Sequence, residues 1–333
     1  MNEVGFYVVT ILIYAALNGI LVLGLNMQFG ITGIFNFAYI LLVAVGAYAT
    51  GIAALGPATG GTHYIGGFGW PFPWDLAFGM AATIVFSLGL ALVAFRRISH
   101  WYLALTLSAI AWALLVLATN DLGLVNGEIG LAGIAGPWQD QLDPTTYQFA
   151  FLGLALFALA ITYVVFWRVE RSPLGRALRA VREDEIAASS LGKSPARLKT
   201  VGFLLGAAAA GLGGGLSAIY LGGWSTGSWA PGETFILLTA VIVGGRGWAP
   251  GAILGSLIVL EGIIEGTRFL PDLGGRTDIL PALQSMMVGL VLLAVLWWRP
   301  HGLWPEPKER FDGVRESGAR APISPKAVPS DDA

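Results

Sequence analysis

Charged side chains that could take part in chemistry gather in one stretch of this 333-residue chain, from Arg171 to Lys199. Eight of the nineteen Lys and Arg residues lie in this stretch or directly beside it, whereas its flanks are apolar. Arg176, Arg179 and Arg182 recur at a spacing of three, which places them along one helix face as a basic stripe. Such a stripe can bind anionic lipid or a groove on another protein.

The residue types that most catalytic sites require are absent from the sequence or scattered along it. The chain has no cysteine, which excludes a thiolate nucleophile and a cysteine-bound metal. Its three histidines, His63, His100 and His301, have no metal-ligand spacing. Gly192-Lys193-Ser194 is similar to the end of a phosphate-binding loop, but the motif requires glycine where Ala187 stands. We therefore expect no enzyme activity and no metal, cofactor or nucleotide bound by this chain.

The composition indicates a protein that crosses a membrane many times. Hydrophobic residues make up 55% of the chain and charged residues 12%, and the mean hydropathy is +0.70. A span needs about 20 apolar residues. Nine segments meet or approach this length and predict an all-α, polytopic transmembrane helical bundle of about nine spans, within a range of eight to ten: 5–27, 31–55, 74–95, 102–119, 149–167, 201–221, 235–243, 251–264 and 280–298. The seventh is short and could be part of a longer, broken helix.

Positive charge gives the orientation of these spans. With segment 171–199 on the cytosolic side and nine spans, seventeen Lys and Arg residues lie inside, and only Arg268 and Arg276 lie outside. This asymmetry predicts an outer N-terminus and a cytoplasmic C-terminus. The basic residues lack the interleaved aromatic residues of a nucleic-acid surface, so we expect no nucleic-acid partner.

The charged stretch carries its own helix signals. Ser172-Pro173 is an N-cap followed by proline at the first helical position. Asp184 can cap a second short helix that ends at Gly192, and Ser194-Pro195 starts the next span. The first helix has an apolar face of Leu174, Leu178 and Val181 beside its basic stripe.

Two interpretations of these short helices are open. They can dock on a protein below the membrane, or they can lie on anionic lipid as an ordinary positive-inside loop. A protein groove is selective for shape, whereas lipid adhesion is diffuse. A bulky residue at Gly175 or Ala187 should therefore disturb the first interaction and not the second.

The run from Arg171 to Gly192, R-S-P-L-G-R-A-L-R-A-V-R-E-D-E-I-A-A-x-x-L-G, resembles the cytosolic loop of the M-type permease subunits of branched-chain amino acid ABC importers. The resemblance implies that these are coupling helices that sit in a groove of an ATP-binding subunit. The residues it assigns to this coupling loop are Ser172, Pro173, Leu174, Gly175, Arg176, Leu178, Arg179, Arg182, Glu183, Asp184, Glu185, Ala187, Ala188 and Gly192.

The opening of the second span resembles the same family, which has a T-G-x-x-x-x-x-A segment followed by G-A-Y at this position. Here Gly46-Ala47-Tyr48 completes the pattern, and Tyr39 departs from it. Polar or small residues in this region are candidates for the translocation path, namely Asn26, Thr32, Gly33, Asn36 and Phe37. Alternatively, Asn36 hydrogen-bonds a neighbouring helix. The residues Gln28-Phe29-Gly30 predict a tight turn between the first two spans.

Other segments complete the resemblance, which extends from about residue 21 to 303. The acidic, glycine-rich region 120–146 contains N-G-x-x-G-L-x-G-I and resembles the outer loop that faces the substrate-binding protein, or it is a solvated loop. The motifs G-G-R-G at 244–247 and P-H-G-L at 300–303 also match the family. We expect a permease domain at 1–303 and a polar, disordered tail at 304–333. Glu261 and Glu265 are expected to reach the interface or meet Arg268.

The resemblance implies a multi-pass subunit of the bacterial inner membrane that imports branched-chain or related amino acids. Its partners would be an H-type permease, two ATP-binding subunits that hydrolyse ATP, an extracytoplasmic binding protein and membrane lipid. An importer of urea or short amides is an alternative. An ion-coupled secondary carrier is a weaker one, because it predicts charged residues at mid-membrane and an inverted repeat.

Overall fold

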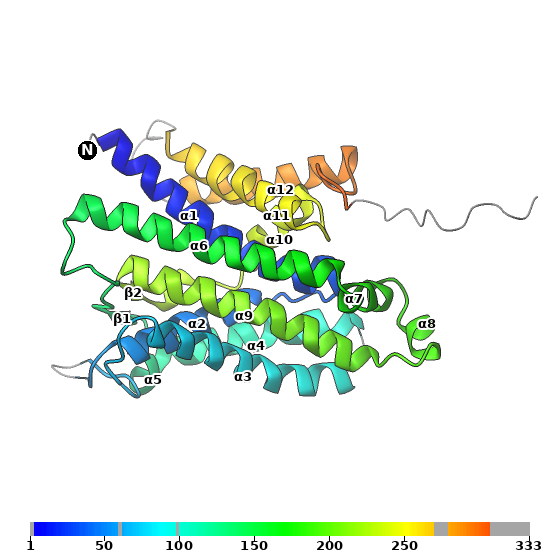
Figure 1. Ribbon diagram of the computed structural model, residues 1–333, viewed down its shortest axis with the longest axis horizontal. Coiled ribbons are helices and arrows are strands. Elements are labelled where there is room, and N and C mark those ends of the chain that lie inside the picture. The colour runs from blue at the N-terminus through cyan, green and yellow to red at the C-terminus, as the bar shows by residue number, and fades with distance from the viewer. Residues whose placement is uncertain (1–2, 59–61, 98–99, 270–278, 307–333) are drawn as a thin grey trace, which may run out of the picture.

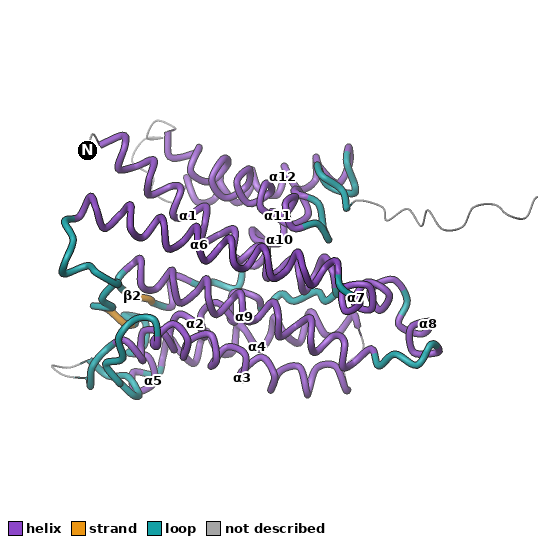
Figure 2. The backbone as a smooth tube through the Cα atoms, in the orientation of Figure 1, coloured by secondary structure: helices purple, strands orange, loops and turns teal. Residues whose placement is uncertain are grey.

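The computed structural model describes residues 3–58, 62–97, 100–269 and 279–306. Long helices make up most of the described chain and run side by side along one direction (Figure 1). The chain is drawn by secondary structure in Figure 2, where two very short strands interrupt an otherwise helical and looped backbone.

The elements follow one another in this order: α1 (Glu3–Leu25), the π-helical η1 (Asn26–Ile31), α2 (Tyr39–Ala54), α3 (Trp74–Arg97), α4 (His100–Asn120), α5 (Leu122–Val125), β1 (Leu131–Ala132), α6 (Pro144–Arg171), α7 (Pro173–Glu183), α8 (Glu185–Ser190), α9 (Pro195–Leu221), β2 (Gly223–Trp224), the 3₁₀ helix η2 (Thr226–Ser228), α10 (Glu233–Gly244), α11 (Ala249–Ser256), the π-helical η3 (Leu257–Glu265), the 3₁₀ helix η4 (Gly266–Phe269) and α12 (Ile279–Trp298).

The predicted all-α polytopic bundle is confirmed. Six helical stretches of the described chain are long and apolar enough to cross a membrane, and three further apolar helices, Tyr39–Ala54, Ala249–Ile263 and Ala282–Trp298, are shorter. The number of nine spans therefore stays a prediction. The short seventh segment, 235–243, belongs to a longer stretch, Thr226–Gly244. This agrees with the expectation that it could be part of a longer, broken helix. The chain is therefore a multi-pass membrane protein.

The predicted turn between the first two spans is wrong. Residues Asn26–Ile31 continue the first helix as η1, and the chain leaves it only at Thr32, before α2 begins at Tyr39. The side chain of Gln28 is buried and has a partner, since its Nε2 donates to the Phe203 carbonyl at 2.8 Å. The connection to α2 covers residues 32–38, where Gly33 has a φ of +77° that suits glycine.

Helix α9 lies at the centre of the bundle and packs against α1, α2 and α3. Small residues permit close approach between these helices. A Cβ at Gly214 would overlap the Val43 carbonyl oxygen, and a Cβ at Gly46 would lie 2.5 Å from Gly211 Cα. Without side chains between them the backbones of α2 and α9 make direct van der Waals contact, which is how helices associate where lipid offers no hydrophobic gain.

At one end of the bundle the region 120–146 is partly ordered by long-range contacts. Strand β1 pairs antiparallel with β2, so that Leu131 faces Trp224. The buried Asn126 donates from Nδ2 to the Gly130 carbonyl and accepts from the His63 amide. At the start of α6, hydrogen bonds from Thr146 hold the pKa of the exposed Asp143 carboxyl below its usual value.

The two ends of the bundle carry different segments. The start of α1, β1 and β2 lie at one end, and α7, α8 and the end of α12 lie at the other (Figure 1). This arrangement agrees with an odd number of spans. Of the predicted tail, residues 304–306 are folded onto the bundle and 307–333 lie outside the described residues, so the predicted disorder of the tail stays a prediction.

We predict that Gly214→Leu will destabilise the bundle, because its side chain has to displace the backbone of α2. The expected loss of stability is about 3 kcal/mol, seen as a lower unfolding temperature in detergent and less protein in the membrane. Gly153→Leu is the matched control, since Gly153 is exposed on α6 and a Cβ there meets no atom within 4 Å. Equal stability of the two variants would contradict the close α2–α9 contact.

Candidate functional site

The predicted cytosolic loop forms the two short helices expected from its sequence. The Ser172 hydroxyl accepts from the Gly175 amide at 3.3 Å and starts α7, which has proline at its first position. Asp184 Oδ1 accepts from the amides of Ile186 and Ala187 at 2.8 and 3.0 Å and starts α8. Helix α9 begins at Pro195 as predicted, although the side chain of Ser194 makes no cap bond.

The apolar face of α7 points into the bundle. Leu178 and Val181 are 0% and 1% exposed, and Leu174 is half-buried. Helix α7 packs against α6, α9 and η1. Most of this face is therefore covered by contacts within the chain.

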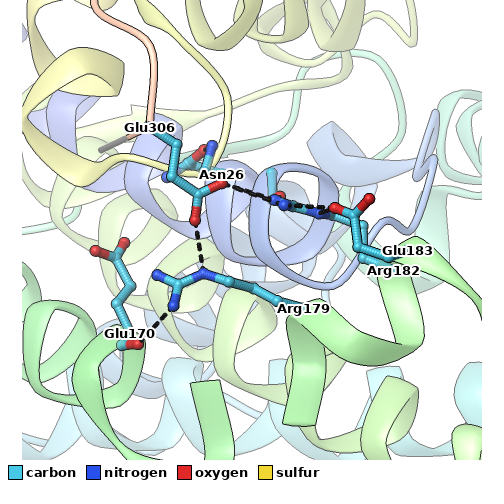
Figure 3. Close-up of polar contacts among 8 residues, drawn as sticks. Asn26, Glu170, Arg179, Arg182, Glu183 and Glu306 are labelled. Carbon is cyan, nitrogen blue, oxygen red and sulfur yellow. Dashed lines mark hydrogen bonds and ion pairs between the residues drawn. The ribbon is translucent and has the colours of Figure 1, made fainter. Parts of the chain in front are cut away.

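The three arginines of the basic stripe on α7 do not share one environment. Arg176 is exposed, but Arg179 and Arg182 turn inward to Glu306, which follows α12 (Figure 3). Arg179 Nε lies 2.6 Å from Glu306 Oε1, and its Nη1 donates to the Glu170 carbonyl at 3.2 Å. Two of the three predicted arginines thus stabilise the loop itself.

Arg182 joins three parts of the chain. Its Nη1 donates to the Gly30 carbonyl at the end of η1. Its Nη2 lies 3.2 Å from Glu306 Oε2 and 2.8 Å from Glu183 Oε1. Helix α7 is therefore bonded directly to the end of the first membrane helix and to the C-terminal segment.

Gly175 is not a surface position. A Cβ there would lie 2.5 Å from the Glu170 carbonyl oxygen and even closer to that of Val169. A larger residue would push α7 away from α6, so substitution at Gly175 tests the fold of the subunit and not its docking. Ala187, by contrast, is exposed on α8.

The part of the loop that faces outward is centred on α8. Ile186 and Leu191 are 79% and 82% exposed, which is unusual for large apolar side chains beside charged residues. Lys199 forms an ion pair with Glu185 and ties α8 to the beginning of α9. Of the predicted loop residues, the exposed ones are Pro173, Arg176, Glu183, Asp184, Ala187 and Gly192, the half-buried ones are Ser172, Leu174, Arg179, Arg182 and Glu185, and the buried ones are Gly175, Leu178 and Ala188.

The candidate path residues lie at the break between α1 and α2. Asn36 Nδ2 donates to Gln28 Oε1 at 2.9 Å, which confirms the alternative that this side chain bonds the preceding helix. Asn26 Oδ1 accepts from the Gly247 amide at 2.8 Å, and Thr32 Oγ1 donates to the Met27 carbonyl. Phe37 is half-buried and its ring lies 5.0 Å from that of Phe235. The polar members therefore have partners within the subunit.

The structure brings the two groups of candidates together. A Cβ on Gly33 would lie 2.8 Å from Arg182 Cγ, so the break between α1 and α2 rests on α7. Three further residues belong to this site and are not indicated by the sequence, namely Gly30, Glu170 and Glu306. For Glu306 the only indication in the sequence is its position directly after the P-H-G-L motif, and the sequence predicted it to be part of the tail.

The two acids of η3 bond to α1. Asn18 Nδ2 donates to Glu261 Oε1 at 2.9 Å, and the Tyr7 hydroxyl donates to Glu265 Oε2 at 3.2 Å. The side chain of Arg268, the partner expected from the sequence, lies outside the described residues. Among the described residues, no group of three His, Asp or Glu side chains could hold a metal ion.

Known proteins identify the family. The chain is 29% identical over 309 residues to the high-affinity branched-chain amino acid transport system permease protein LivM of Escherichia coli (strain K12), covering 86% of this chain and 67% of the relative. It is 30% identical over 303 residues to LivH of the same strain, covering 84% and 91%. It is 26% identical over 234 residues to the guanosine ABC transporter permease protein NupQ of Bacillus subtilis (strain 168), covering 66% and 70%.

No solved structure matches the chain. Residues 7–296 match the family described as branched-chain amino acid transport system / permease component. This range includes the coupling-loop motif, the break between α1 and α2 and the G-G-R-G turn, and the resemblance predicted from these motifs is confirmed. The chain therefore belongs to the branched-chain amino acid transport system permease family.

Proposed function

We propose that this chain is the M-type membrane subunit of an ATP-driven importer of branched-chain or related amino acids. The observation that carries the proposal is the exposed tip of the loop, where Ile186 on α8 and Leu191, directly after α8, protrude from a segment that an ion pair holds to α9. Exposed apolar side chains rimmed by charge are typical of a protein interface. The partner at this tip would be an ATP-binding subunit.

The proposed assembly contains an H-type permease, two ATP-binding subunits and an extracytoplasmic binding protein. ATP hydrolysis belongs to the partners, since nothing in the sequence of this chain resembles a complete nucleotide site. The similarity to both LivM and LivH supports a transporter with two related permeases. The translocation path would then lie between the two, and Asn26, Thr32, Gly33, Asn36 and Phe37 would shape it indirectly by holding the break between α1 and α2.

The fixed position of α7 suggests how movement could be transmitted. Closure of the ATP-binding subunits would push α8, and α7 would carry the displacement through the bond from Arg182 to the Gly30 carbonyl. Because that carbonyl ends the first membrane helix, the displacement would reach the bundle without a flexible link. Alternating access would follow from this lever.

The proposed orientation places α7 and α8 in the cytoplasm of a bacterial cell and the N-terminus outside the inner membrane. We predict that a cysteine replacing Ser189, exposed on α8, reacts with a membrane-impermeant thiol reagent only after permeabilisation. A cysteine replacing the exposed Ile129, near β1, should react in intact cells. The natural chain has no cysteine and serves as the blank. Reaction at Ser189→Cys in intact cells would contradict the proposed topology and support the opposite one.

We predict that Ala187→Leu abolishes solute uptake and solute-stimulated ATP hydrolysis by the assembled transporter while the subunit still inserts. The added side chain increases affinity for lipid but collides with the wall of a protein groove. Uptake of radiolabelled leucine and ATP hydrolysis in liposomes measure the two effects.

Gly175→Leu and Gly153→Leu complete this test. The first should reduce the amount of folded subunit, because Gly175 packs on α6, and the second should be tolerated. Normal uptake by Ala187→Leu at normal protein levels would favour the lipid interpretation and would remove the docking role from α8.

The solute class is tested by competition for uptake. We expect unlabelled leucine, isoleucine and valine to suppress uptake of labelled leucine, and urea, acetamide and guanosine to have no effect. Guanosine is included because one relative carries that name. Competition by urea or guanosine, without competition by valine, would assign the chain to another solute.

A further inference from the structure

The segment after α12 folds back along the end of α10. The Leu303 amide donates to the Val243 carbonyl at 2.9 Å, and the Trp304 amide donates to the Gly244 carbonyl at 3.1 Å. Both acceptors belong to the last turn of α10, where carbonyl groups have no partner within the helix. Residues 299–306, which we term the strap, therefore donate hydrogen bonds to the last carbonyl groups of a membrane helix.

Two glycines allow the strap to lie this close. A Cβ at Gly302 would lie 2.5 Å from Gly245 Cα, and a Cβ at Gly245 would overlap the Trp304 carbonyl oxygen. Both glycines also have positive φ, 84° and 117°. The motifs G-G-R-G and P-H-G-L, separated by more than fifty residues, are thus the two halves of one backbone contact.

The contact between the strap and the end of α10 places Glu306 beside α7. The Glu306 carboxylate lies between the guanidinium groups of Arg179 and Arg182, with one oxygen 2.6 Å from the first and the other 3.2 Å from the second (Figure 3). Side-chain exposures are 24%, 21% and 15% respectively. The three charges are partly screened from water, so this carboxylate offsets repulsion between two neighbouring arginines.

We infer that Glu306 is a positioning residue that fixes the coupling-loop helix α7 to the membrane bundle through the strap. Without the carboxylate, Arg179 and Arg182 would repel each other and turn toward solvent. Arg182 would then release the Gly30 carbonyl, and α7 would lose its bond to the first membrane helix. The role of this connection in transport rests on the proposed function, whereas the connection itself does not.

The connection is tested by hydrogen exchange of the purified chain in lipid nanodiscs. The probes are the amides of Leu303 and Trp304, which exchange when the strap detaches. We expect Glu306→Gln, which keeps the shape and removes the charge, to speed exchange by about fivefold. Glu306→Asp should fall between the natural chain and Glu306→Gln, and Glu306→Lys should exchange fastest because it adds repulsion.

Arg299→Gln is the matched control, because it removes a charge from the exposed beginning of the same strap. It should exchange like the natural chain. If only the shape of the Glu306 side chain mattered, the natural chain and Glu306→Gln would exchange at equal rates. That result would overturn the inference. Equal acceleration by Arg299→Gln would also overturn it, since the effect would then come from net charge.

The consequence for transport is measured in the assembled transporter. We expect Glu306→Gln to lower the amount of leucine taken up per ATP hydrolysed, with Arg299→Gln unchanged. Faster exchange with an unchanged ratio would remove the coupling role of Glu306. Failure of the natural chain to support ATP-dependent uptake would instead contradict the proposed function and leave the exchange result valid.

Discussion

Polar groups buried within a membrane bundle must find partners inside the protein, and this requirement shapes the end of the molecule that carries α7 and α8. The first helix loses its regular pattern at η1, and the following residues are not helical although most are buried. Their donors and acceptors are satisfied from several elements. Asn36 bonds Gln28, Gln28 bonds the Phe203 carbonyl on α9, and Asn26 bonds the Gly247 amide. The break is therefore stable only when α9 and the turn after α10 are in place.

The same requirement explains why α7 is so firmly held. The carbonyl of Gly30 lies at the end of η1, and a guanidinium group is well suited to a helix C-terminus because it donates hydrogen bonds and is positively charged. Arg182 can reach that carbonyl because the apolar face of α7 is buried against α6 and α9. Burial of Leu178 and Val181 thus sets the rotation of α7, and the rotation sets the direction of its arginines.

Much of the fold could be predicted from the sequence, because its strongest signals are local. Apolar runs located the six long apolar helices and the three shorter ones, and cap residues located the starts of α7 and α8. The predicted turn at Gln28-Phe29-Gly30 was wrong because the sequence does not show that Gln28 is buried against α9, where its bond to the Phe203 carbonyl accompanies a helix that continues to Ile31. The basic stripe was misinterpreted for a similar reason. Periodicity gives the faces of a helix, but only tertiary contacts decide which face is covered, and Arg179 and Arg182 proved to be on the covered side.

Glu306 could not be predicted, because its partners are more than 120 residues away in sequence and its neighbours resemble a disordered tail. Its place follows from a backbone contact between Gly245 and Gly302, which single-sequence patterns do not show.

The two short helices of the loop differ in what they contact, and this difference has a physical basis. In the proposed importer, α8 would receive the movement of the ATP-binding subunit through its exposed apolar side chains, and α7 would transmit it because its bonds to η1 and the strap resist rotation. A ligand or partner shifts a conformational equilibrium only through contacts that differ between the two states. If α7 could rotate freely, binding at α8 would be absorbed by that rotation, and the membrane helices would experience little difference between the states.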